Sequence, residues 1–313
     1  MKVVVTEFIW PEGLEILAEI GQVIYDPYLW RSELLFEAVS DADGLIVRNQ
    51  TKVTRNLLQS ASRLKVIGRL GVGLDNIDLQ AAREKGVPVV FARNCNAISV
   101  AEYVFACVLS FARRPLEATA EVKKGNWDRQ RFTGMELFGK ILGLVGVGEI
   151  GTRLAFRAKA FGMELLGYDP FLSPYEMANT DFQVKMVSLE ELMSQSDFVS
   201  LHLPYNQATR HLINRQNIAL MKSTAYLINS SRGGIIEEQS LYEALASRRI
   251  AGAALDVFEQ EPPEGSPLLT LDNVILTPHV AGLTGEAQVK TSVLVARETV
   301  KVLRGHPSLC IAQ

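Results

Sequence analysis

The hydrophobic residues of this chain occur in short continuous runs that alternate with segments of helical spacing. Over the first hundred residues the runs predict strands at 3–5, 23–25, 44–48, 64–68 and 87–91. Apolar positions three and four residues apart predict helices between them, as in 12–20, where Gly21 suits a left-handed helix end. Alternating strands and helices are typical of parallel strands joined by right-handed crossovers, so we expect an α/β fold.

A second series of apolar runs begins near Lys140. It predicts strands at 141–146, 164–168, 198–203, 225–229, 252–256 and 274–276. Their nearly continuous hydrophobicity is typical of parallel strands that are buried on both faces. Helical patterns precede and follow this series: one starts at Ser99, a predicted N-cap, and is interrupted at Pro115, and another covers 286–303. The pattern as a whole predicts two doubly wound parallel-sheet domains.

Composition and charge narrow the class of protein. The 313 residues are 48% hydrophobic and 21% charged, which is ordinary for a globular chain of about two domains. The net charge of -3 and the lack of a basic tail argue against binding to nucleic acid or anionic lipid. No apolar stretch approaches the ~20 residues that span a bilayer, and no secretory signal precedes the first strand. Three cysteines without a CxxC pattern make no disulfide framework. We therefore expect a soluble, cytoplasmic protein without a metal site.

A glycine-rich loop is the strongest local signal for a ligand. Gly146, Gly148 and Gly151 form a G-x-G-x-x-G pattern directly after a predicted strand, and a helix begins at Glu149. Such a loop lets the backbone approach a pyrophosphate, which the N–H groups of the first helical turn then bind. Asp169, 18 positions after Gly151, ends the next predicted strand. There it can bind both ribose hydroxyls of NAD and repel the 2′-phosphate of NADP. The alternative is a bare structural turn. The predicted NAD-binding residues here are Gly146, Gly148, Glu149, Ile150, Gly151 and Asp169.

Several further segments occur in a fixed order along the chain. Besides the glycine loop they are 68–78, 96–102, 201–204, 227–234, 254–262 and 277–282. Together they resemble the D-isomer-specific 2-hydroxyacid dehydrogenases over nearly the whole chain. The resemblance implies a Rossmann-type NAD-binding domain at 99–282 and a flavodoxin-like substrate domain formed by 1–98 and 283–313. It also implies a homodimer, or a dimer of dimers, assembled through the helix 99–120 and the segment that follows to Trp127; the alternative is that this helix is buried within one subunit.

The resemblance implies that Arg232, Glu261 and His279 are the catalytic residues, placed in a cleft between the domains. Reduction of a 2-keto acid requires a hydride at carbon and a proton at oxygen, and a histidine is suited to handling that proton near neutral pH. A carboxylate beside the imidazole raises its pKa and fixes its tautomer. A guanidinium can hold the substrate carboxylate in a bidentate fork. Taken singly, these residues could equally be a surface ion-pair partner, a loop acid and a turn residue.

The resemblance also implies supporting residues. Backbone N–H groups of Leu70, Gly71, Val72 and Gly73 are expected to bind the substrate carboxylate, and Asp256 is expected to meet the nicotinamide amide. The remaining residues expected along the cofactor and substrate path are Pro204, Thr209, Asn229 and Asn96. We interpret His202, in a predicted buried strand, as a hydrogen-bonded core residue.

Within the family, segments 45–54 and 125–134 resemble the D-3-phosphoglycerate dehydrogenases. Arg48 and Arg69 would then supply positive charge for a distal phosphate or sulfonate; the alternative is that both form surface ion pairs. The pair Asn49–Gln50 and the segment 94–96 depart from the usual pattern of those enzymes. Hydroxypyruvate, glyoxylate and sulfolactate therefore remain alternative substrates to D-3-phosphoglycerate.

Two further expectations concern the extent and the class of the protein. Because the chain ends at Gln313, we expect a short form without a C-terminal regulatory domain. Related corepressors use the same fold to sense NAD, so a non-enzymatic binding protein is the alternative class. The absence of a regulatory tail or a basic arm disfavours that alternative.

Overall fold

The computed structural model describes residues 1–172 and 182–312. It divides into two compact units, one formed by Met1–Asn96 with Leu283–Gln313 and the other by Ala97–Gly282. The first crossing between the units coincides with the start of helix α5 (Ala97–Arg113). This start lies before Ser99, which is buried within the helix, so the predicted N-cap at Ser99 was wrong.

The first unit is built on a five-stranded parallel sheet. Its strands are β1 (Lys2–Val5), β2 (Gln22–Tyr25), β3 (Gly44–Val47), β4 (Val66–Arg69) and β5 (Val89–Phe91). They lie in the order β2-β1-β3-β4-β5, and every pair is parallel. This is one of the two common orders of a doubly wound sheet.

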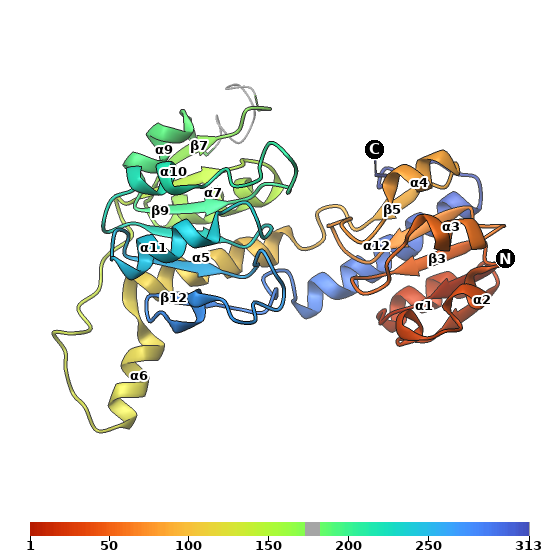
Figure 1. Ribbon diagram of the computed structural model, residues 1–313, viewed down its shortest axis with the longest axis horizontal. Coiled ribbons are helices and arrows are strands. Elements are labelled where there is room, and N and C mark those ends of the chain that lie inside the picture. The colour runs from red at the N-terminus through yellow and green to blue at the C-terminus, as the bar shows by residue number, and fades with distance from the viewer. Residues whose placement is uncertain (173–181, 313) are drawn as a thin grey trace. The chain divides into compact units, whose positions relative to one another are not determined.

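Helices cover both faces of this sheet, as Figure 1 shows. They are α1 (Pro11–Ala18), η1 (Leu29–Arg31), α2 (Leu35–Val39), α3 (Arg55–Ser60), α4 (Leu79–Glu84) and α12 (Gly285–Leu303). Val3 and Val5 pack in one buried cluster with α1 and α12, whereas Val4 packs in a second cluster with α2, α3 and α4. Successive side chains of a strand point to opposite faces, so a continuous run of valines fills both layers.

The second unit is built on seven parallel strands. In chain order they are β6 (Ile141–Val145), β7 (Glu164–Tyr168), β8 (Lys185–Met186), β9 (Phe198–Leu201), β10 (Tyr226–Asn229), β11 (Gly252–Leu255) and β12 (Val274–Leu276). The sheet order is β12-β11-β10-β9-β6-β7-β8. Strands β7 and β9 flank β6 on opposite sides, so the chain reverses its direction of winding beside β6. Ligands of such sheets bind at this point, outside the carboxyl ends of the strands.

Two helical layers enclose the second sheet. The helices are α5, α7 (Glu149–Ala160), α9 (Leu189–Gln195), α10 (Arg215–Leu220), α11 (Glu238–Ala246) and η2 (Pro267–Thr270). Helix α6 (Pro115–Lys123) follows α5 but buries no residue against the sheet. One buried cluster joins α5 and α7 to the sheet, and another joins α9, α10 and α11 to the opposite face. Helices α5 and α6 are separated at Arg114, which has a left-handed backbone conformation directly before Pro115.

The predicted fold class is confirmed in both units. The apolar runs correspond to strands, with ends that differ by at most two residues, and the two-residue strand β8 was not predicted. Among the described residues, no helix is long and apolar enough to span a membrane.

Candidate active site

The glycine loop lies between β6 and α7, at the carboxyl edge of the second sheet. Gly146 has a φ of 93°, and a Cβ atom there would lie 2.5 Å from the carbonyl oxygen of His202. At Gly151 a Cβ would lie 2.5 Å from the oxygen of Gly146, so the start of α7 packs directly on the loop. The space beside Gly148, the N-cap of α7, is open within 4 Å. The loop thus leaves the positive end of a helix accessible to a phosphate group.

Asp169 follows β7, the strand beside β6. Its carboxylate accepts hydrogen bonds from the backbone N–H of Val147 at 3.1 Å and of Phe171 at 3.0 Å. These bonds hold the acid against the glycine loop, where a ribose of NAD would lie. Glu149 pairs its side chain with Arg153, one helical turn later, so the groups that it and Ile150 offer a ligand are their backbone N–H groups.

The loop after β9 carries two of the residues predicted to bind the cofactor. The hydroxyl of Thr209 donates to the carbonyl of Pro204 at 2.7 Å and accepts from the N–H of Asn206 at 2.8 Å. The two residues therefore close a compact loop, which leaves β9 next to the glycine loop because β9 pairs with β6.

His202 differs from its predicted role. It lies just beyond β9, and both of its ring nitrogens are buried with no hydrogen-bond partner among the residues described. Its ring approaches the position that a Cβ at Gly151 would occupy, at 3.8 Å. Burial lowers the pKa of His202 to about 4, because no partner compensates for the desolvation of the charged ring. The interpretation of His202 as a hydrogen-bonded core residue was therefore wrong.

The structure brings together the imidazole and the acid of the predicted triad. Nδ1 of His279 lies 2.9 Å from Oε2 of Glu261, and Oε1 of Glu261 accepts from the backbone N–H of Phe258 at 3.2 Å. A carboxylate only accepts, so the imidazole donates through Nδ1, which leaves Nε2 to exchange a proton. The His279 side chain is 52% exposed, as a group that meets a ligand must be.

Asp256 fixes the segment that carries His279. Its buried carboxylate accepts from the hydroxyl of Thr277 at 2.6 Å and from the backbone N–H groups of Val280 and Ala281, both at 2.8 Å. The hydroxyl of Tyr103 on α5 lies 2.6 Å from that of Thr277 and extends the network. His279 itself has a φ of 56°, a left-handed conformation that this network maintains.

Arg232 lies in the turn after β10, next to β11. The side chain of Asn229 braces this turn: it donates to the carbonyl of Arg232 at 2.9 Å and accepts from the N–H of Ser231 at 3.0 Å. A Cβ at Gly233 would lie 1.8 Å from the carbonyl oxygen of Phe258, so the turn touches the loop that carries Glu261. The elements that carry Arg232, Glu261 and His279 therefore belong to one edge of one sheet.

The predicted substrate-binding residues lie in the first unit. Arg69 ends β4, and its guanidinium donates to the side-chain oxygen of Asn49 at 2.8 Å and to the carbonyl of Leu70 at 3.0 Å. Leu70 is buried, Gly71 and Gly73 are half-buried, and Val72 is exposed. Asn96 is half-buried in the turn that precedes α5.

Arg48 follows β3 and is half-buried. Its guanidinium donates to the side chain of Gln288 on α12 and to the carbonyl of Phe8 at 3.5 Å. It forms no ion pair in the part of the chain that the structure covers, which disfavours the alternative of a surface ion pair for Arg48. Burial lowers the pKa of Arg48, and the charge of Glu7 opposes that effect.

Several residues of these networks were missed by the sequence analysis. They are Glu7, Asn76, Tyr103, Thr277 and Gln288. Glu7 and Thr277 each follow a strand at its carboxyl end, and Asn76 lies in the motif segment 68–78, so the sequence held a signal for these three; Tyr103 and Gln288 carry none. Within residues 1–172 and 182–312, no group of three or more His, Cys, Asp or Glu side chains could hold a metal ion.

Comparison with known proteins places this site in a family. The model of the NAD-binding domain of the D-isomer-specific 2-hydroxyacid dehydrogenases matches residues 105–281. The D-3-phosphoglycerate dehydrogenase of Methanocaldococcus jannaschii is 50% identical over 98% of this chain, and the hydroxypyruvate reductase of Thermotoga maritima is 42% identical over 93%. The crystal structure of the TT0316 protein of Thermus thermophilus superposes with a TM-score of 0.89 at 33% identity, with both chains covered completely.

The two relatives differ in how much of their own length is matched. The chain spans 58% of the phosphoglycerate dehydrogenase but 92% of the hydroxypyruvate reductase. It therefore covers little more than half the length of the phosphoglycerate dehydrogenases that it matches.

The buried imidazole of His202 predicts a pH dependence of stability. Its pKa is about 4 in the folded chain against an ordinary 6.5, so the unfolded chain takes up a proton between these values and the folded chain does not. The contribution of neutral His202 to the free energy of unfolding is complete above pH 6.5 and is lost as the pH falls towards 4. We expect about 1 to 3 kcal/mol of unfolding free energy to be lost in this way.

Urea unfolding at several pH values measures this loss. In His202→Leu the decline in unfolding free energy between pH 6.5 and 4 should be shallower than in the wild type. The exposed His306, changed to Leu, is the matched control and should keep the wild-type slope. Equal slopes in all three proteins would contradict the assignment.

Proposed function

The chain belongs to the D-isomer-specific 2-hydroxyacid dehydrogenase family, and we propose that it transfers a hydride between NAD and C2 of a small 2-hydroxy acid. The observation that carries this proposal is the 2.9 Å contact between Nδ1 of His279 and Oε2 of Glu261. It supplies an oriented imidazole at the same sheet edge as a glycine loop that fits a dinucleotide.

His279 handles the proton of the reaction. Its protonated form donates through Nε2 to the oxygen on C2 when the keto acid is reduced, and its neutral form takes the proton back in oxidation. Glu261 keeps the other nitrogen as a donor and stabilises the imidazolium through its negative charge. The bond from Phe258 N–H to Oε1 leaves Oε2 directed at the ring.

Arg232 holds the substrate. Its guanidinium pairs with the carboxylate of the 2-hydroxy acid and polarises the C2 carbonyl. The turn that bears it is fixed by Asn229, which keeps the backbone of Arg232 in place. The backbone N–H groups of 70–73, in the first unit, are proposed as separate donors for the substrate.

The cofactor is NAD. The cradle formed by Gly146, Gly148 and Gly151 accepts its pyrophosphate, and Asp169 accepts hydrogen bonds from its ribose hydroxyls. When bound, NADH supplies the hydride. Asp256 fixes the segment that carries His279. We also propose that its carboxylate contacts the nicotinamide amide.

We propose 3-phosphohydroxypyruvate and D-3-phosphoglycerate as the substrate pair. Arg48 is a half-buried cation whose partners, Gln288 and the carbonyl of Phe8, are neutral, so its charge is available to a distal phosphate. Arg69, bound to the amide of Asn49, adds a second positive charge at a neighbouring strand end. The 50% identical relative is a D-3-phosphoglycerate dehydrogenase.

Hydroxypyruvate reduction is the second candidate. The observation that favours it is the match to a hydroxypyruvate reductase over 92% of that protein's length. Hydroxypyruvate lacks the phosphate, so it would not need the charge of Arg48.

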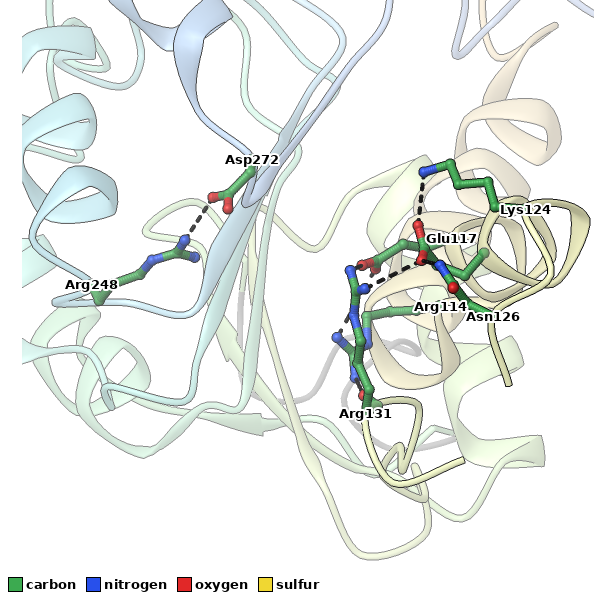
Figure 2. Close-up of polar contacts among 8 residues, drawn as sticks. Arg114, Glu117, Lys124, Asn126, Arg131, Arg248 and Asp272 are labelled. Atoms are coloured by element: carbon green, nitrogen blue, oxygen red, sulfur yellow. Dashed lines mark hydrogen bonds and ion pairs between the residues drawn. The ribbon is translucent and has the colours of Figure 1, made fainter. Parts of the chain in front are cut away.

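We propose that the protein works as a dimer in which α5 and α6 meet a second copy. Helix α6 has no buried residue, and Leu116 and Trp127 are 80% and 79% exposed. Figure 2 shows Arg131 beside Glu117 on this segment. Glu117 and Arg131 pair at 3.1 Å and Lys124 pairs with Glu121 at 2.8 Å, so the segment is held by its own ion pairs. A nine-residue helix without tertiary packing is marginal in water, which favours a covered surface here.

A panel of 2-keto acids tests the activity. The purified protein with NADH is assayed against 3-phosphohydroxypyruvate, hydroxypyruvate, glyoxylate and sulfopyruvate, and we expect the highest kcat/KM for the phosphorylated acid. His279→Asn should lower kcat by about 10²- to 10⁴-fold because the proton donor is lost. Its Kd for NADH, measured by fluorescence titration, should not change.

Other outcomes of the panel have definite meanings. Preference for hydroxypyruvate would support the second candidate, and preference for glyoxylate or sulfopyruvate would overturn both. Binding of NADH without turnover of any acid would favour an NAD-sensing binding protein.

Cofactor selectivity tests the role of Asp169. We expect Asp169→Ala to shift the ratio of kcat/KM for NADPH over NADH upward by about tenfold or more, since the acid both binds the ribose and repels the 2′-phosphate. Glu149→Ala, which removes an acid at the start of α7 that offers the cofactor only its backbone, is the control and should leave the ratio unchanged. An unchanged ratio in Asp169→Ala would remove its assigned role.

Sedimentation analysis tests the assembly. We expect a dimer in the micromolar range for the wild type and dissociation into monomers for Leu116→Asp, which puts a charge into the proposed contact. Leu309→Asp changes an equally exposed residue of the other unit and should remain dimeric. A monomeric wild type would rule the dimer out.

A further inference from the structure

A buried carboxylate in the first unit gathers four consecutive backbone donors. Oε1 of Glu7 accepts from the N–H groups of Arg48 at 2.8 Å and Thr51 at 2.9 Å. Oε2 accepts from those of Asn49 at 3.0 Å and Gln50 at 2.9 Å. Successive N–H groups that converge in this way form an anion-binding nest, and here the anion is a side chain of the protein.

The same segment is held from its carbonyl side. Nδ2 of Asn76 donates to the carbonyl of Arg48 at 3.1 Å and to that of Thr51 at 2.7 Å. The hydroxyls of Thr6 and Thr51 lie 2.7 Å apart and add a third attachment. Together, Glu7 and Asn76 fix the backbone at both ends of 48–51, while the side chains of Asn49 and Gln50 remain exposed.

The ionised form of Glu7 is the form that this geometry requires. Burial raises its pKa, but the backbone hydrogen bonds of Gln50, Thr51 and Arg48 outweigh burial and lower the pKa below its ordinary value. A neutral amide in its place would offer one oxygen and would direct its own N–H groups at backbone donors.

We propose that Glu7 is a positioning residue that holds the segment 48–51 in place for the substrate and thereby sets the affinity for its anionic groups. The fixed backbone directs Arg48 towards Gln288 and Asn49 towards Arg69, so one buried acid orders both arginines. This inference rests on the proposed function, because it assigns those arginines to the substrate.

Steady-state kinetics of the full-length chain tests the inference. Glu7→Gln should raise the KM for 3-phosphohydroxypyruvate by about 10- to 100-fold, the loss expected when charge-assisted hydrogen bonds are removed. Both kcat and the Kd for NADH should stay within about threefold, because His279 and the glycine loop belong to the other unit. Glu7→Asp, which keeps the charge with a shorter reach, should show a smaller rise in KM.

Asp43→Asn is the matched control. Asp43 is also a buried carboxylate of this sheet that accepts a backbone hydrogen bond, from Lys2 at 2.9 Å, but it lies at the opposite end of β3. The substitution should lower Tm without changing KM. A similar rise in KM for Asp43→Asn, or an unchanged KM in Glu7→Gln, would overturn the inference. If Glu7→Gln does not fold, a wild-type KM in Glu7→Asp would overturn it equally.

Amide hydrogen exchange separates this inference from the proposed function. Exchange in the peptide that contains 48–51 should be faster in Glu7→Gln than in the wild type, with no change in the glycine loop. If the wild type reduced none of the acids, the proposed function would fail, and the exchange result alone would decide whether Glu7 holds the segment 48–51 in place. Unchanged exchange over 48–51 in Glu7→Gln would overturn that role of Glu7.

Discussion

Three donors of the segment 277–281 converge on the carboxylate of Asp256, and the geometry of the catalytic candidates depends on that convergence. The segment has no regular structure, and its central residue, His279, has a left-handed backbone that a non-glycine residue adopts only at a cost. A buried acid that accepts three hydrogen bonds can hold such a segment because leaving those donors unpaired would cost more. The contact of His279 with Glu261 follows from it.

The same physical device recurs at the carboxyl ends of other strands. Asp169 follows β7 and binds the N–H of Val147 after β6, and Glu7 follows β1 and binds the segment after β3. In each pair the strands are neighbours, so the acid of one reaches the loop that leaves the other. Parallel sheets end in loops whose N–H groups have lost their ladder partners, and a neighbouring carboxylate satisfies several of them at once. The acids thereby give irregular loops fixed positions.

Contacts between an acid and the loop of a neighbouring strand depend on the order of strands in the sheet, and this limits what the sequence alone could predict. Continuous apolar runs predicted nearly every strand, and the glycine pattern with Asp169 predicted the dinucleotide loop, since both signals are local. The catalytic candidates Arg232, Glu261 and His279 came from the order of motifs along the chain, and their role stays a prediction. The support of Glu7 for 48–51 could not be predicted, because it requires β1 to lie beside β3 in a known register. The predicted N-cap at Ser99 was wrong because a local capping pattern does not include tertiary packing. The helix α5 begins two residues earlier, at Ala97.

The division of labour between the two units has a chemical consequence. His279, Glu261, Arg232 and the glycine loop all belong to one unit, whereas Arg48 and Arg69 belong to the other. Under the proposed function, the residues assigned to proton transfer and cofactor binding are therefore in a different unit from those assigned to a distal phosphate. Under the same proposal, substitution at positions 48–50 would change the acid that is accepted, while Asp256 and Asp169 would keep the second unit's site in place. Shared chemistry with different substrates, as in the phosphoglycerate dehydrogenase and the hydroxypyruvate reductase that this chain resembles, is the outcome expected of such a separation.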